Sequence, residues 1–118
     1  MKKHLQTGKE GEALAAAWLA ERGYAVLHRN WRHSYYEIDI IALKEGVLHF
    51  IEVKARKTDR FGYPEEAVNR KKLNKLMKAA EVFLEQQPQW KKVQYDVVAV
   101  RWQGIAPLIE LFEDLYHW

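Results

Sequence analysis

The sequence predicts an α/β domain with a mixed central sheet and flanking helices, in the order αβββαββ. Two segments carry apolar residues at helical spacing, and five others carry the alternation or short apolar runs typical of strands. The chain has 118 residues, the usual length of one domain, and shows no internal repeat or linker. Residues 1–118 are therefore expected to share a single core.

The amino-terminal half is expected to contain one helix and three strands. Thr7 and Glu10 match a capping box, so the first helix should begin there, and Gly23 suits its carboxyl end. The predicted strands are residues 24–30, 38–43 and 47–55. The last two should form a hairpin, because a tight turn is expected at Glu45-Gly46.

The carboxyl-terminal half is expected to contain a second helix and two more strands, after a basic loop over residues 56–63. Asn69 is the expected cap of this helix, which should stop before Pro88. Its apolar residues form one stripe: Leu73, Leu76, Met77, Ala80, Phe83 and Leu84. Residues 95–102 and 108–112 are the last two predicted strands.

The composition excludes several classes of protein. Apolar residues make up 48% and charged residues 30%, which is a globular balance rather than a disordered or collagen-like one. The chain has no cysteine, so disulfides, thiolate zinc sites and cysteine nucleophiles are excluded. Its longest apolar run, residues 13–20, is far shorter than the roughly 20 residues of a bilayer span. The amino terminus does not match a secretory signal, so we expect a soluble cytoplasmic protein with no membrane partner.

Positive charge is concentrated in one region of the chain. There are 19 Lys and Arg against 16 Asp and Glu, a net charge of +3. Residues 54–78 contain nine basic and three acidic residues, so the remainder of the chain is net acidic. Such asymmetry favours a surface that binds a polyanion. A solvated helix face beside a basic loop is the alternative explanation.

Two acids are predicted to meet within the central hairpin. A two-residue turn at 45–46 fixes the register and places Asp39 opposite Glu52, and Glu37 opposite Lys54. Facing carboxylates repel one another unless a cation lies between them, and their oxygens suit Mg²⁺ or Mn²⁺. Lys54 projects from the same strand face as Glu52, where it could hold a water or phosphate oxygen. The alternative is a solvent-exposed face on which these four side chains form salt bridges.

Glu12 is a further candidate for this acidic site. It lies at the edge of the predicted buried face of the first helix, close in angle to Ala16 and Leu19. A carboxylate in that position needs a partner. It is either a third acid at the metal or a rim glutamate paired with an arginine.

Aromatic and histidine residues give weaker signals. Tyr35 and Tyr36, beside Arg32, either stack on unpaired bases or pack on neighbouring strands. The five histidines are scattered without metal-ligand spacing, so zinc ligation is not expected. His49 should lie on the strand face opposite Glu52, which argues against a role as general base.

Several motifs resemble those of one family. They are Gly8-x-x-Gly11-Glu12-x-x-Ala15, Gly23-Tyr24, Arg29-Asn30, Glu37-Ile38-Asp39, Glu52-Val53-Lys54-Ala55-Arg56 and Tyr95-Asp96-Val97-Val98, with Lys72 on the second helix. In this order, over nearly the whole chain, they resemble the YraN-type family of predicted endonucleases, which is similar to archaeal Holliday junction resolvases of the PD-(D/E)XK nuclease superfamily. Two departures are Ile38 in place of the superfamily's proline and Tyr36 where the family often has glycine, which should narrow the approach to the hairpin.

The resemblance implies a restriction-endonuclease-like core and a metal-dependent nuclease that acts on structured or branched DNA. Asp39, Glu52 and Lys54 would form the catalytic triad, with Glu12 as an additional acid. Mg²⁺ or Mn²⁺ would be held by Asp39, Glu52, Glu12 and the Val53 carbonyl. The metal would activate a water that attacks the phosphodiester.

The partner expected from this resemblance and from the charge distribution is nucleic acid, in particular DNA. The basic residues expected to contact its backbone are Arg32, Arg56, Lys57, Arg60, Lys71 and Lys72. Resolvase-like relatives act as dimers, so a homodimer is also considered. Two alternatives stay open: a catalytically silent nucleic-acid-binding module, and a protein-interaction subunit.

Overall fold

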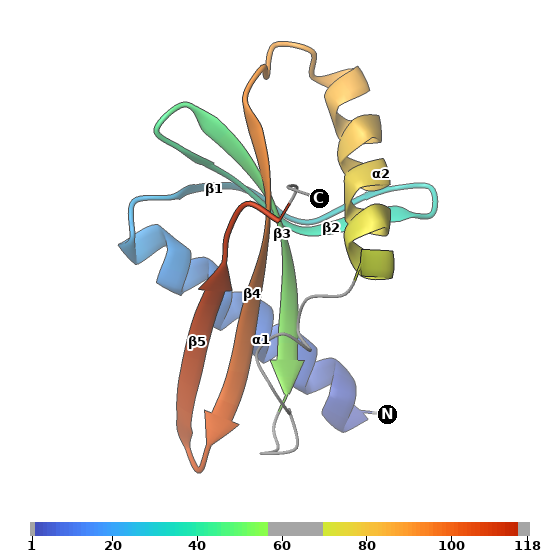
Figure 1. Cartoon of the computed structure of the whole chain (residues 1–118). Helices are drawn as coiled ribbons and strands as arrows, with labels where there is room; N and C mark the ends of the chain where they lie inside the picture. The colour runs from blue at the N-terminus through green and yellow to red at the C-terminus, as the bar shows by residue number, and fades with distance from the viewer. Residues whose placement is uncertain (1, 57–69, 116–118) are drawn as a thin grey trace.

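The computed structural model of the protein describes residues 2–56 and 70–115. Within these residues the chain forms two helices and five strands, in the predicted order αβββαββ (Figure 1). They are α1 (Lys2–Glu21), β1 (Ala25–His33), β2 (Tyr36–Lys44), β3 (Val47–Arg56), α2 (Arg70–Gln86), β4 (Val93–Gln103) and β5 (Ala106–Phe112). Neither helix has the length and apolarity that a membrane span requires within the part of the chain described.

The strands form one mixed sheet in the order β1-β2-β3-β4-β5. The strands β3 and β4 run parallel, whereas the other neighbours run antiparallel. A parallel pair cannot be joined by a hairpin, and α2 lies in the crossover that joins these two strands. The prediction of a mixed α/β sheet is therefore confirmed.

The two helices cover opposite faces of the sheet, with α1 behind the strands and α2 in front of them in Figure 1. The α2 cluster consists of Ile38, Ile41, Leu48 and Phe50 from the sheet with Leu73, Leu76, Ala79, Ala80 and Phe83 from the helix. The α1 cluster consists of Ala15 and Leu19 from the helix with Tyr24, Ile40, Ala42, Ile51, Val98 and Val100. Because side chains alternate along a strand, β3 supplies apolar residues to both layers.

The first helix differs from its prediction at one end. It begins at Lys2, so Thr7 lies inside the helix and the predicted capping box is wrong. Residues 2–6 contain no glycine or proline, and nothing in them stops the helix from extending. At the other end Gly23 adopts a φ of 92°, and its N–H donates to Ala20 while Tyr24 N–H donates to Leu19. The predicted glycine stop is thus confirmed, as a Schellman motif.

Helix α1 approaches β3 closely at a second glycine. A Cβ atom built on Gly11 would lie 2.5 Å from the Cβ atom of Ala55. No larger residue fits there without movement of the helix or the strand. The absence of a side chain at Gly11 therefore holds the neighbouring Glu12 near the carboxyl end of β3.

The strand predictions are right in position but short at their ends. The predicted strand over residues 24–30 continues to His33, because Asn30 adopts a φ of 55° without ending it. Asparagine tolerates this left-handed conformation better than most residues. The turn at Glu45-Gly46 is confirmed, with φ values of 50° and 80°. The second helix also agrees with its prediction, although the expected cap, Asn69, lies outside the described residues.

Candidate active site

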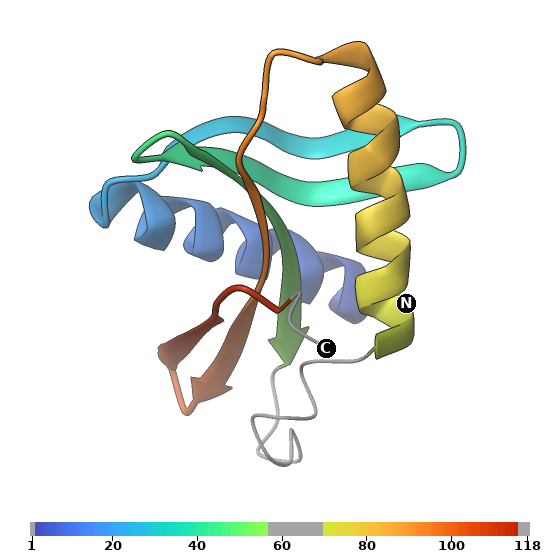
Figure 2. The ribbon, with the colours of Figure 1, turned by 45° about the horizontal axis from the view of Figure 1, so that its top comes forward.

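The strands β2 and β3 separate at the position of the two predicted acids. Their ladder runs from Lys44–Val47 to Ile40–Ile51, as the two-residue turn predicts. Beyond that point β3 stays paired with β4 as far as Arg56. Figure 2 shows the β1–β2 hairpin passing behind α2 while β3 runs away from it. We call this divergence, immediately beyond Ile40 and Ile51, the strand fork.

Asp39 and Glu52 are the first residues of β2 and β3 beyond the ladder. In place of a ladder bond, Val53 N–H donates to Asp39 Oδ2 at 2.8 Å. The N–H and C=O of a strand residue point to the same side, so the Val53 carbonyl also faces the fork. The fork therefore brings together Asp39, Glu52 and the Val53 backbone, just beyond the last paired residues of the register that the turn predicts.

The predicted pairing of Glu37 with Lys54 does not form, because the strands have already diverged. Glu37 instead pairs with Arg32 on β1, at 3.1 Å between Arg32 Nη2 and Glu37 Oε2. The two side chains are 58% and 74% exposed, so this ion pair contributes little to stability. Arg32, a predicted nucleic-acid contact, thus lies on the surface beside an acid.

The side chains of β2 change from one face of the sheet to the other at Asp39, so the strand fork borders both layers of the fold. Ile38 packs in the α2 cluster, whereas Ile40, two residues further on, packs in the α1 cluster. Strict alternation would place both side chains on the same face. Asp39 therefore lies at a twist in β2, within electrostatic range of Glu12 on α1 as well as Glu52 on β3.

Burial and neighbouring acids disturb the ionisation of Asp39. Burial raises its pKa, and the charges of Glu12, Glu52 and Glu37 raise it further. The hydrogen bond from Val53 N–H acts in the opposite direction, and the resulting pKa is about 7. The arginine-paired rim position considered for Glu12 is not seen within residues 2–56 and 70–115.

Basic groups oppose the negative charge at Glu52. Burial raises the pKa of Glu52, while Lys72, Lys54 and Lys75 lower it. The pKa of Lys54 falls to about 8, first through burial and then through a hydrogen bond with Lys72 and repulsion from Arg56 and Lys72. Lys54 therefore lies between the acid of its own strand and the amino-terminal end of α2.

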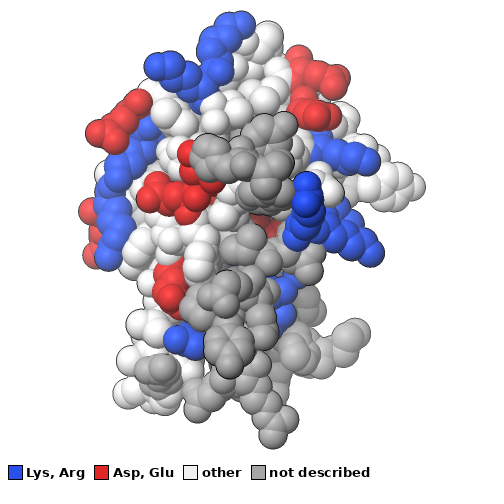
Figure 3. All heavy atoms as spheres, in the orientation of Figure 1, with Lys and Arg blue, Asp and Glu red and all other residues white. Residues whose placement is uncertain are grey.

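The fork opens into a groove of about 580 Å³. Its lining residues are Tyr35, Tyr36, Glu37, Asp39, Glu52, Val53, Lys72, Lys75, Leu76 and Lys78. Acids from β2 and β3 thus face lysines from α2, with two tyrosines from the β1–β2 hairpin alongside. In Figure 3, lysine and arginine side chains lie at the right of the view, where Figure 1 places α2, and others lie at the top and along the left edge.

The other predicted basic contacts fall into two groups. Lys71 and Arg56 are exposed but do not line the groove, and Arg56 donates to the carbonyl of Ala55. Lys57 and Arg60 lie outside the described residues. Sequence reasoning missed Lys75 and Lys78 as site residues, although their spacing of three residues from Lys72 signals a shared helix face.

The strand fork offers oxygen donors of the kind that Mg²⁺ accepts. Within the described residues, no group of three or more His, Asp or Glu side chains is arranged to hold a metal ion. Mg²⁺ is commonly held by one or two carboxylates and keeps several waters. Asp39, Glu52 and the Val53 carbonyl supply oxygen donors of this kind. Burial is the main cause of the raised pKa of Asp39, and the charges of the neighbouring acids, which raise it further, are what a cation would neutralise.

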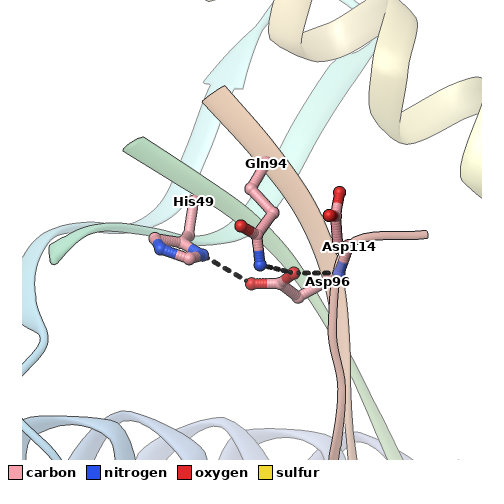
Figure 4. A network of polar contacts seen from close by, with 4 residues as sticks. All are labelled: His49, Gln94, Asp96 and Asp114. Carbon is pink, nitrogen blue, oxygen red and sulfur yellow. Dashed lines mark hydrogen bonds and ion pairs between the residues drawn. The ribbon is translucent and has the colours of Figure 1, made fainter. Parts of the chain in front are cut away.

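A second polar network lies in the layer beside α1 (Figure 4). His49 Nδ1 donates to Asp96 Oδ2 at 2.7 Å, while Gln94 Nε2 and the Asp114 N–H both donate to Oδ1. As predicted, His49 lies away from Glu52. Its pairing with Asp96 was not predicted, because it depends on the parallel register of β3 and β4.

Comparison with known proteins identifies the family. The family model described as uncharacterised protein family UPF0102 matches residues 11–100. The chain belongs to this family. The matched segment contains Glu12, Asp39, Glu52, Lys54 and Lys72, and membership agrees with the YraN-type resemblance in the sequence.

Two relatives illustrate the extent of this similarity. The UPF0102 protein of Phocaeicola vulgatus is 37% identical over 117 residues, covering 99% of this chain and 97% of the relative. The UPF0102 protein of Sulfurihydrogenibium sp. (strain YO3AOP1) is 44% identical over 108 residues, covering 91% of this chain and 94% of the relative. The sequence similarity therefore extends over almost the whole length of both relatives.

Proposed function

We propose that the protein is a metal-dependent nuclease that hydrolyses phosphodiester bonds in structured or branched DNA, with the restriction-endonuclease-like site of the PD-(D/E)XK superfamily. The observation that carries this proposal is the meeting of Asp39 and Glu52 at the strand fork, with Lys54 two residues beyond Glu52. Two acids with raised pKa values that line one groove, next to a lysine with a lowered pKa, are typical of a catalytic site.

The acids favour catalysis over simple nucleic-acid binding. Carboxylates beside a phosphate path repel the ligand, and burying them raises the pKa of both Asp39 and Glu52. A protein that only binds DNA gains nothing from this arrangement. A protein that must hold a divalent cation against a phosphodiester gains its binding site.

Asp39, Glu52 and the Val53 carbonyl would hold Mg²⁺ or Mn²⁺, with Glu12 acting from α1. The ion, when bound, supplies Lewis-acid activation of a water and of the phosphodiester. The Val53 N–H donates to Oδ2 of Asp39, which orients the carboxylate.

Lys54 and the lysines of α2 act on the phosphate. Hydrolysis adds water across a P–O bond, and negative charge builds on the phosphoryl oxygens as the leaving oxygen departs. A protonated Lys54 beside Glu52 stabilises that charge, and its pKa of about 8 keeps it mostly protonated at neutral pH. Lys72 and Lys75 lower the pKa of Glu52 and so lie within its electrostatic range, and they would hold the neighbouring phosphates.

The described beginning of α2 supports an anionic ligand independently of the fork acids. It carries Arg70, Lys71 and Lys72 in succession. Lysine and arginine side chains attract phosphate, so these residues favour a polyanion as the ligand.

The test is a cleavage assay on single strands, flaps, gapped duplexes and four-way junctions with Mg²⁺ or Mn²⁺. Wild type should cleave at least one of these substrates only with metal, and Glu52→Gln and Lys54→Ala should lower the rate by about 100-fold or more. Glu81→Gln, which removes an exposed acid of α2 outside the groove, is the matched control and should keep full activity. Absence of cleavage by wild type, or full cleavage by Glu52→Gln, would overturn the proposal.

A further inference from the structure

Tyr35 occupies an unusual position beside the groove. It lies at the tip of the β1–β2 hairpin, next to Ser34 with a φ of 57°, where His33 pairs with Tyr36. Its side chain is 98% exposed, so it does not pack on neighbouring strands. Tyr36, the next residue, is 38% exposed and lines the same groove. An aromatic ring exposed in this way offers a free face for stacking.

Lysines connect these tyrosines to the acids. Lys72, Lys75 and Lys78 line the groove at steps of three residues along α2, a rise of about 4.5 Å per step. Lys72 and Lys75 act on Glu52, so this end of the row lies beside the acids. Lys78 follows along the helix towards Gln86, whose Nε2 contacts His33 Nδ1 of the hairpin at 3.1 Å. The row therefore leads from the strand fork towards the hairpin tip.

We propose that the groove binds a single strand of DNA, with an unpaired base stacked on Tyr35 and the backbone phosphates on Lys75 and Lys78. Aromatic stacking beside a basic track is the usual recognition of single strands, because every unpaired base has an accessible face. Bases inside a duplex are already stacked on both sides. The volume of about 580 Å³ is within the range of pockets that enclose a small ligand, which suits one or two nucleotides.

This inference names the substrate class of the proposed nuclease. Single-strand binding does not require the proposed function, whereas cleavage of the bound strand does. The row of lysines directs the strand from Tyr35 towards Asp39 and Glu52. The substrate is then DNA with an unpaired nucleotide next to the scissile bond, such as a flap, a gap or a free single strand. Fully paired duplex DNA lacks the base that Tyr35 requires.

The stacking is tested by fluorescence anisotropy in EDTA, with a labelled single-stranded oligonucleotide and a duplex of the same sequence. Tyr35→Ala should weaken single-strand binding by about 5-fold to 100-fold, the usual effect of losing one stacked base, and leave duplex binding unchanged. Tyr35→Phe, which keeps the ring, is the matched control and should bind like wild type. A 2-aminopurine in the oligonucleotide should be quenched by wild type and not by Tyr35→Ala.

Phosphate binding by the row of lysines is tested by the salt dependence of the same single-strand binding. Lys75→Gln and Lys78→Gln should each lower the slope of log affinity against log salt by about 0.7. Lys91→Gln, which removes an exposed lysine outside the groove, should leave the slope unchanged.

Equal binding of single strand and duplex, or single-strand binding that Tyr35→Ala leaves intact, would overturn this inference whether or not the protein cleaves DNA. Tyr35-dependent binding without metal-dependent cleavage would support it and contradict the nuclease.

Discussion

Asp96 and Asp39 both lie within the fold, but their surroundings differ. Asp96 on β4 is fully buried and accepts hydrogen bonds from the His49 ring, the Gln94 amide and the Asp114 N–H. Asp39 on β2 is partly buried and, within the described residues, accepts one hydrogen bond, from Val53 N–H. The charges of three nearby acids, Glu12, Glu52 and Glu37, each raise the pKa of Asp39 in addition to the effect of burial.

The difference separates a structural carboxylate from one that, under the proposed function, binds a cation. The donors around Asp96 compensate for its burial and tie β3, β4 and the segment after β5 together. Asp39 is surrounded by like charges, so the folded protein carries an uncompensated cost at the strand fork. Such local costs are typical of functional sites, where stability and activity conflict. Substitutions at the two aspartates should therefore have opposite effects on stability.

Asp96→Ala should have the largest effect. It removes three hydrogen bonds and leaves the His49 ring and the Asp114 N–H without their acceptor. Breaking a buried pair of this kind costs about 3–5 kcal/mol of unfolding free energy, which urea denaturation would measure. Glu113→Gln, at an exposed position of the same region, is the control and should change stability by less than about 0.5 kcal/mol. A loss below about 1 kcal/mol for Asp96→Ala would show that the network is not structural.

Asp39→Asn should stabilise the protein at pH 8. The folded pKa of Asp39 is about 7, above its value of 3.8 without such surroundings, so its contribution is present below pH 4 and lost as pH rises through 7. Asparagine carries no charge and can still accept from Val53 N–H. After allowance for solvent screening, we expect a gain of about 2 kcal/mol at pH 8 and none at pH 4. Thermal unfolding at the two pH values measures it, and a loss of stability at pH 8 would contradict the comparison.

Gly11→Ala should destabilise the protein by about 1–2 kcal/mol, because its Cβ atom would meet Ala55. Gly8→Ala is an internal control in the same helix, with nothing within 4 Å of its Cβ atom. Alanine favours the helix over glycine, so this second substitution should stabilise by about 0.5–1 kcal/mol. Urea denaturation of both variants measures the difference. Equal effects at both positions would show that α1 does not depend on close contact with β3 to place Glu12.

The sequence alone predicts that Asp39 and Glu52 lie near each other, because this prediction depends only on the geometry of one short hairpin. A two-residue turn at Glu45-Gly46 and the alternation of side chains fix the register that leads to Asp39 and Glu52. The same reasoning fails at Glu37 and Lys54, since the strands diverge before that pair and tertiary packing decides the divergence.

Features that depend on longer-range packing could not be predicted in the same way. The His49–Asp96 pair requires the parallel register of β3 and β4, which are separated by a helix. The row of lysines on α2 can be assigned to the groove only when the position of α2 relative to the β1–β2 hairpin is known. Both become visible only when distant segments are placed together.

The most direct test of the central claim is whether the fork acids bind a divalent cation. Calorimetric titration with Mn²⁺ at low salt and pH 8, alone and with a non-cleavable phosphorothioate DNA, would compare wild type, Asp39→Asn, Glu52→Gln and the control Glu81→Gln. We expect wild type and Glu81→Gln to bind the metal, and both fork variants to lose binding. Failure of wild type to bind Mn²⁺ even with DNA, or equal binding by all four proteins, would contradict the account.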